Sequence, residues 1–175
     1  FWASDVIKEL SAKHIVNGVS EQLFAPAGDV TRSEFTSLIA RVLGLQVEEG
    51  TEASFTDVEA DAWYTSAIIA ANKAGIIQGR EQGLFDPNAP VTREEMAVIV
   101  MRAYQYAKGG TAVAADEASF NDEDQISGWA KDSVQAAKIL GIINGHSNGQ
   151  FAPQSMMTRA ESVQVIYNLL QLLEE

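Results

Sequence analysis

The chain carries one block of sequence three times, and this internal repetition restricts its fold more than any other feature. Each block opens on a tryptophan, and a threonine follows 29 residues later. The recurring residues are Trp2, Trp63 and Trp129; Gly18, Gly79 and Gly145; Phe24, Phe85 and Phe151; Pro26, Pro87 and Pro153; and Thr31, Thr92 and Thr158. The tryptophans lie 61 and then 66 residues apart, so all variation in length falls between the blocks. We interpret the block as a folding unit that is repeated three times.

Each unit is predicted to be a helix, a loop and a second helix. The first helix follows the tryptophan, and its apolar residues recur at helical spacing, as in Ile68, Ala71 and Ala74. The second helix begins at the threonine and carries a similar stripe, as in Met96, Ile99, Val100 and Ala103. Sustained strand alternation is absent from the sequence, which favours an all-α fold. We expect units at residues 1–45, 55–107 and 120–175, linkers at 46–54 and 108–119, and a first unit that lacks its N-terminal part.

The second helix of every unit starts with a capping box that contains an arginine. Thr31 and Glu34 have the spacing at which the two side chains cap the first helical turn reciprocally. Thr92 with Glu95 and Thr158 with Glu161 repeat it. The arginines that follow the threonines are Arg32, Arg93 and Arg159.

These arginines would occupy the first helical position, where the helix dipole disfavours a cation. They are either surface residues paired with an acid such as Glu34, or ligands for an anion. Their repetition at an unfavourable position favours the second interpretation. A guanidinium binds a carboxylate through two parallel hydrogen bonds. Free amides at the helix start would favour the same anion, so we expect the anion at the helix start and the arginine to play no part in folding.

Composition excludes several classes of protein. The net charge is -12, from 24 acidic and 12 basic residues, which argues against binding to nucleic acid. The chain has no cysteine, and no apolar run is long enough to enter a membrane. The acidic clusters at 57–61 and 122–124 lack the spacing of a calcium loop, and we interpret them as turns ahead of a helix. His14 and His146 stand alone, so we expect no metal, no cofactor and no enzyme activity.

The order of motifs in each unit resembles that of the surface-layer homology (SLH) family. The pattern is F-x-D, as in Phe55 to Asp57 and Phe120 to Asp122, followed by W, G-I-x-x-G, F-x-P and T-R-x-E. The resemblance implies a pseudo-threefold bundle in which the T-R-x-E helices form a central three-helix core. It also implies an exported bacterial protein that is anchored to the cell wall through a secondary wall polysaccharide. That polymer often carries a pyruvate ketal on N-acetylmannosamine.

The resemblance further implies that the polysaccharide binds in grooves between adjacent units, with the T-R-x-E arginine as a main contact. Unit one departs from the pattern in three places. It has no F-x-D box, and His14 stands where the other units have Gly75 and Gly141. Gln22 replaces the glycine found at positions 83 and 149. We therefore expect the groove of unit one to be the most altered.

Nine residues are the candidates for carbohydrate binding: Arg32, Arg93, Arg159, Trp2, Trp63, Trp129, Gly18, Gly79 and Gly145. The tryptophans either belong to the core or stack on the apolar face of a sugar, and both roles are compatible. The glycines either permit a special backbone conformation or let backbone amides reach the sugar.

Two functions other than wall anchoring remain as alternatives. A repeat bundle could be a protein-interaction module that assembles a surface lattice. A polysaccharide hydrolase would need two carboxylates across one sugar bond, and the sequence offers no such pair. We expect the isolated module to be a monomer.

Overall fold

The computed structural model describes residues 2–16, 25–48, 50–81, 83–110 and 120–175. In these residues it contains six α-helices, a short 3-10 helix and isolated β-bridges, but no β-strand. The first helices of the units are α1 (Ser4–Ala12), α3 (Thr65–Lys73) and α5 (Lys131–Ile139), and the 3-10 helix η1 (Glu123–Gln125) precedes α5. The second helices are α2 (Arg32–Leu43), α4 (Arg93–Ala107) and α6 (Arg159–Glu174). The predicted all-α fold of three helix-loop-helix units is confirmed.

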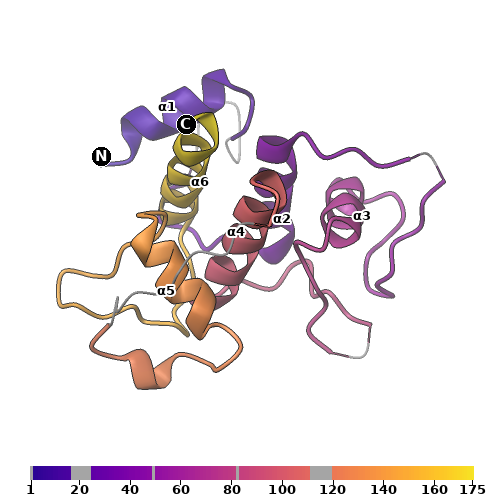
Figure 1. The fold of residues 1–175 in the computed structure, drawn as a ribbon. Coiled ribbons are helices and arrows are strands. Elements are labelled where there is room, and N and C mark those ends of the chain that lie inside the picture. The colour runs from indigo at the N-terminus through magenta and orange to yellow at the C-terminus, as the bar shows by residue number, and fades with distance from the viewer. Residues whose placement is uncertain (1, 17–24, 49, 82, 111–119) are drawn as a thin grey trace.

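The second helices pack against one another at the centre of the molecule, and the first helices surround them (Figure 1). The central contact is made by apolar residues at equivalent positions of the three helices. Ile39, Val100 and Ile166 each lie eight positions into their helix and are fully buried. Burying such a side chain contributes about 1.5–3 kcal/mol relative to leaving it in water. The predicted pseudo-threefold bundle with a central three-helix core is thus built on the stripe that follows each capping box.

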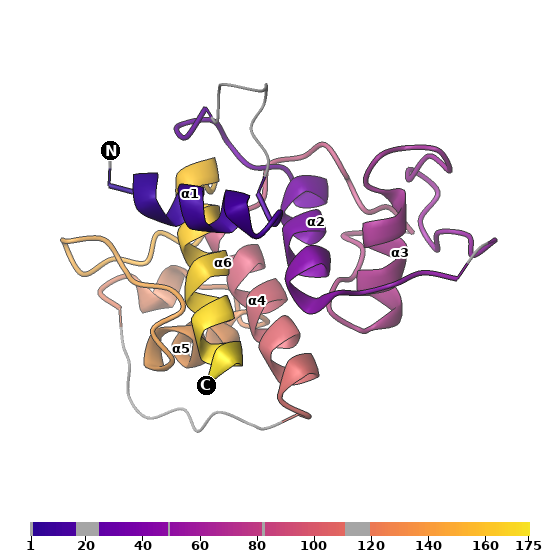
Figure 2. The ribbon, with the colours of Figure 1, turned by 90° about the horizontal axis from the view of Figure 1, so that it is seen from above.

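The units are interleaved, because each first helix packs on the central helix of the unit before it. Helix α3 packs on α2 and α5 on α4, and α1 closes the ring against α6 (Figure 2). At this closure Lys13 Nζ lies 3.1 Å from Glu174 Oε1. Each block therefore buries part of its apolar surface against its neighbours.

The predicted capping boxes are present at the start of all three central helices. Thr31 Oγ1 accepts a hydrogen bond from the amide of Glu34 at 3.2 Å, and the Glu34 carboxylate accepts one from the amide of Thr31 at 2.8 Å. The boxes at Thr92 and Thr158 have the same two bonds.

The remaining amides at each helix start donate to the following unit. The Arg32 amide donates to the carbonyl of Ala89 at 2.9 Å, and the Ser33 amide to that of Pro87 at 3.0 Å. Helix α4 meets the loop of unit three in the same way, and α6 meets that of unit one. The expectation of free amides for an anion at the helix start is therefore wrong, because backbone carbonyls already occupy them.

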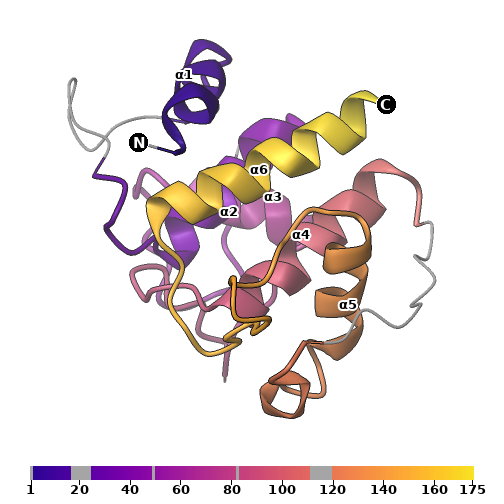
Figure 3. The ribbon, with the colours of Figure 1, turned by 90° about the vertical axis from the view of Figure 1, so that its left-hand side faces the viewer.

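Three backbone hydrogen bonds close a ring just before the central helices α2, α4 and α6, whose arrangement Figure 3 shows from another side. Val30 donates to Met157 at 2.9 Å, Met157 donates to Val91 at 3.0 Å, and Val91 donates to Val30 at 3.0 Å. Each unit thus gives one bond and receives one. The three helix starts are held together by backbone as well as by apolar packing.

The F-x-D box folds back on the loop of its own unit. Phe120 packs on Phe151 with ring centroids 5.2 Å apart, and Asp122 accepts from the amides of Phe151 and Ala152 at 2.7 and 2.8 Å. Ala152 has a φ of 56°, a conformation that alanine rarely adopts. The aspartate therefore links two segments that lie about thirty residues apart in the sequence, and it is not only a local turn residue. Asp57 binds the amides of Phe85 and Asp86 in the same way.

Candidate functional site

Arg32 extends from the start of α2 into unit two, where backbone carbonyls surround it. Its Nε donates to the carbonyl of Phe85 at 2.8 Å and its Nη2 to that of Gln78 at 3.1 Å. Its Nη1 pairs with Glu95 Oε1 at 3.1 Å. The guanidinium carbon lies 4.6 Å from the centroid of the Phe85 ring. Burial lowers the pKa of Arg32, and the charge of Glu95 opposes that effect.

Arg93 repeats this arrangement one unit later. It donates to the carbonyls of Phe151 and Asn144 at 2.6 and 3.0 Å and pairs with Glu161 at 3.3 Å. Arg159 closes the cycle by pairing with Glu34 at 2.7 Å. Each arginine thus reaches the capping glutamate of the next unit.

The expectation that these arginines play no part in folding is therefore wrong, since they link the units. The ligand role remains compatible with this geometry. Three of the five N–H bonds of the Arg32 guanidinium are used, and two remain.

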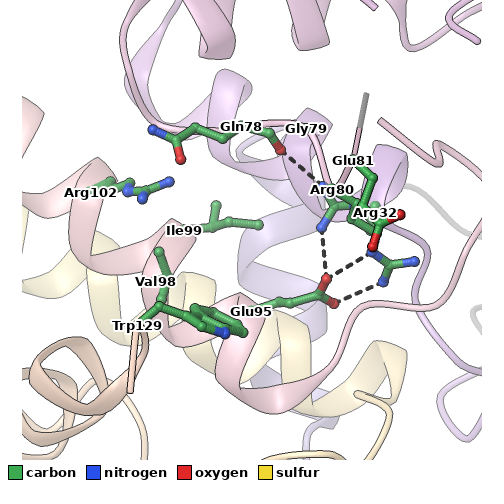
Figure 4. A pocket seen from close by; sticks show the side chains of 10 residues that line it. All are labelled: Arg32, Gln78, Gly79, Arg80, Glu81, Glu95, Val98, Ile99, Arg102 and Trp129. Atoms are coloured by element: carbon green, nitrogen blue, oxygen red, sulfur yellow. Dashed lines mark hydrogen bonds and ion pairs between the residues drawn. The ribbon is translucent and has the colours of Figure 1, made fainter. Parts of the chain in front are cut away.

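A groove at the junction of all three units collects one predicted residue of each kind. Arg32 comes from unit one, Gly79 from unit two and Trp129 from unit three (Figure 4). Its volume is about 460 Å³. We call this the first groove. Arg102 of helix α4 also lines it.

A second groove repeats the combination with the units exchanged in order. Arg93 of unit two, Gly145 of unit three and Trp2 of unit one line it, and its volume is about 240 Å³. The threefold rotation that relates the units therefore also relates the two grooves. Of the other predicted residues, Gly18 lies outside the described residues, and we assign no groove to Arg159 and Trp63.

The tryptophans lie at the surface and not in the core. Trp2, Trp63 and Trp129 are 62%, 65% and 62% exposed. The core interpretation of these residues is therefore wrong. An exposed indole can stack on the apolar face of a ligand, and two of the three indoles line a groove.

The glycines provide space more than backbone freedom. Neither Gly79 nor Gly145 has a positive φ. A Cβ at Gly79 would lie 2.6 Å from the carbonyl of Leu84 and 2.9 Å from the Phe55 ring, and one at Gly145 would lie 2.6 Å from the Phe120 ring. The expected conformational reason is corrected: any side chain would collide with the phenylalanine of the F-x-D box.

The first groove holds more charge than the repeats predict. Arg80 Nε lies 3.0 Å from Glu95 Oε1, so Glu95 pairs with both Arg80 and Arg32. Burial raises the pKa of Glu95, but the hydrogen bonds from Arg80 and the Thr92 amide, together with the charge of Arg32, outweigh it and lower that pKa. Sequence analysis missed Arg80 and Arg102 because neither is repeated in unit three. His146 and Asn168 take their places there and line the second groove.

Within the described ranges, no cluster of three or more histidines and acids could hold a metal ion. No helix in the same part of the chain is long and apolar enough to span a bilayer.

These features define a class of protein: a ring of three interleaved helical units with grooves at their junctions. The family model of the S-layer homology domain matches residues 2–36, 54–97 and 119–161, together more than half of the chain. The chain therefore belongs to the S-layer homology domain family. Domains of this family anchor S-layer and other cell-surface proteins to the cell wall, which places the chain at the bacterial cell surface.

The similar proteins include both enzymes and S-layer proteins. The chain is 45% identical to exoglucanase XynX of Acetivibrio thermocellus over 170 residues. This aligned segment covers 97% of this chain and 16% of that protein. It is 43% identical to an amylopullulanase of Thermoanaerobacterium thermosulfurigenes, over 97% of this chain and 9% of that protein. It is 33% identical to the S-layer protein sap of Bacillus anthracis, over 94% of this chain and 20% of that protein. The chain thus spans a fifth or less of the length of these relatives.

Proposed function

We propose that this chain is a non-catalytic module that attaches a larger exported protein to an anionic polysaccharide of the bacterial cell wall. The carrying observation is that two grooves, related by the threefold rotation, each combine an arginine, a close-packed glycine loop and an exposed tryptophan from three different units. Grooves of about 460 and 240 Å³ suit one sugar of the polymer each.

The chemistry of the grooves supports a sugar that carries a carboxylate. An exposed indole offers an apolar face for the underside of a pyranose ring. The remaining N–H bonds of the arginines, and the loop backbone at Gly79 and Gly145, offer donors at the edge of that ring. A pyruvate ketal on N-acetylmannosamine presents both an apolar face and a carboxylate, and we propose it as the bound group.

The experiment is a calorimetric titration of the protein with a disaccharide that carries the pyruvate ketal and with the same disaccharide without it. We expect measurable binding of the first and at least tenfold weaker binding of the second, because a charge-assisted hydrogen bond contributes about 1.5–3 kcal/mol. Equal affinity for both sugars, or none for either, contradicts carboxylate recognition. Association of the protein without sugar, measured by light scattering, would instead favour the lattice-assembly function.

The attached protein is part of the proposal, because the enzymes among the relatives are far longer than the matching segment. We propose that catalysis resides elsewhere in such proteins and that this module supplies attachment. An assay of the isolated chain on xylan, cellulose and starch tests this directly, and release of reducing sugar above background would overturn it.

A further inference from the structure

Arg102 is a cation in the first groove that no acid among the described residues neutralises. It lies on α4, ten residues after the capping threonine of unit two, and its side chain is half-buried. Among the described residues it forms no hydrogen bond or ion pair. Burial alone lowers the pKa of Arg102, and no neighbouring acid offsets that effect.

The other two arginines of this groove already have acidic partners. Arg32 and Arg80 both pair with Glu95, and Arg80 also lies 3.5 Å from Asp86. Figure 4 shows Arg102 and Gln78 on one side of Ile99, with the Glu95 cluster on the other. An anion that enters the groove would thus meet an unpaired guanidinium at one end and a locally compensated cluster at the other.

We propose that Arg102 binds the carboxylate of the wall sugar and makes the first groove selective for anionic sugars. This inference rests on the proposed function and assigns its charge recognition to one residue. The guanidinium gains two parallel hydrogen bonds from a carboxylate, and its partial desolvation strengthens them. Trp129, which lines the same groove, remains available for the apolar face of the sugar ring.

The equivalent residue is also an arginine in unit one but an asparagine in unit three, so this selectivity belongs to one of the two described grooves. In the second groove the position holds Asn168, whose amide donates to the carbonyls of Gly141 and Ile142 at 3.3 and 3.0 Å. In unit one it holds Arg41, which donates to the carbonyl of Ile15 at 3.0 Å. Neither side chain is a free cation. The second groove therefore has no counterpart of Arg102, and its preference for a charged sugar should be weaker than that of the first groove.

The two grooves can be followed separately because each has its own tryptophan. The indole N–H signal of Trp129 reports on the first groove and that of Trp2 on the second, and Trp→Phe variants assign them. Nuclear magnetic resonance titrations would compare N-acetylmannosamine with and without the pyruvate ketal, for the wild type and for Arg102→Asn. Arg41→Asn removes the same charge at the equivalent position and serves as the matched control.

We expect the wild type to bind the pyruvylated sugar about tenfold or more tightly than the plain sugar at the Trp129 site. Arg102→Asn should abolish this preference and leave the Trp2 site unaffected. Arg41→Asn should preserve the preference. If the wild type shows no preference in either groove, carboxylate recognition as such fails. If the wild type shows it and Arg102→Asn keeps it, the assignment to Arg102 is overturned while the proposed function stands.

A second variant guards against loss of folding, which circular dichroism would detect. Arg102→Lys retains the charge but not the two-pronged geometry, so the preference should fall severalfold without vanishing. A lysine variant with the full wild-type preference would overturn the paired hydrogen bonds that the assignment requires.

Discussion

The arginine of each T-R-x-E motif occupies a position that its own helix disfavours, and its contacts explain why the position is kept. Arg93 stands at the first position of α4, where the helix dipole opposes a cation. Its charge faces Glu161, and its N–H groups face two carbonyls of unit three. The unfavourable local term is offset by contacts that exist only after the units assemble.

We expect Arg93→Ala to lower the free energy of unfolding by about 3 kcal/mol, because it leaves buried carbonyls and a carboxylate without their partner. Arg102→Ala is the matched control, since it removes the same residue type from the same helix at a site where no described residue forms a hydrogen bond or ion pair with it. Its effect should be within about 0.5 kcal/mol. Urea unfolding measures both, and equal midpoints for the two variants would contradict a structural role for Arg93.

The stability of the protein should depend on pH through the carboxyl group of Asp122. Burial raises the pKa of Asp122, but the amides of Phe151 and Ala152 outweigh it and hold that pKa below the ordinary aspartate value. A lowered folded-state pKa stabilises the protein fully above the unfolded value of about 3.9, and the stabilisation is lost as the pH falls through the folded value.

Asp122→Asn should therefore lower the free energy of unfolding by about 1–3 kcal/mol at pH 7. The gap between variant and wild type should close as the pH drops below about 3.9. Thermal unfolding at about five pH values between 2 and 7 would measure how this gap changes. Asp124→Asn, on the exposed η1, is the control and should follow the wild type throughout. A gap that stays constant with pH would show that the carboxylate charge is not involved.

At the scale of elements, the loop between the two helices of a unit is fixed by close contact between the F-x-D box and a glycine. Gly145 lies so near the Phe120 ring that a Cβ would sit 2.6 Å from it and 2.9 Å from the carbonyl of Gln150. The same loop carries the carbonyl of Asn144, which accepts from Arg93. Its position therefore affects both the core of the unit and the junction with its neighbour.

Gly145→Ala should cost about 1–3 kcal/mol of stability, because either the ring or the backbone must move. Gly128→Ala in the same unit is the control: a Cβ there meets nothing within 4 Å and the φ is not positive. Thermal unfolding of the two variants compares them directly. If both behave like the wild type, the loop is more compliant than its contacts indicate.

Short sequence patterns predicted the helices, whereas the candidate site is formed by contacts between residues far apart in the chain. The capping box at Thr92 and Glu95 is a four-residue pattern, so the start of α4 could be predicted from sequence. The partners of Arg32 lie 46 to 63 residues away in the chain, and no spacing rule identifies them. Arg102 has an equivalent arginine in unit one, Arg41, but none in unit three, so a search for residues common to all three units missed it. The first groove could not be predicted from sequence, because it forms only where the three units meet around one axis.

At the scale of the whole molecule, the ring of units separates local charge from net charge. The chain has a net charge of -12, whereas the first groove is lined by three arginines and two glutamates. On the proposed function, we expect an anionic polysaccharide to be repelled at long range and attracted only inside the groove. The two effects differ in range, and added salt distinguishes them because screening acts over about 10 Å at 0.1 M ionic strength.

We expect the affinity for a pyruvylated wall polymer to stay constant or rise slightly as salt is added up to moderate concentration. Screening weakens the long-range repulsion, while the contacts in the partly desolvated groove are screened much less. Surface-immobilised polymer and a series of sodium chloride concentrations would measure this. The polymer stripped of its pyruvate is the matched control, and its weaker binding should not vary with salt. A steep fall in affinity for the pyruvylated polymer would mean that diffuse attraction to exposed basic residues dominates, and the grooves would then not be the seat of charge recognition.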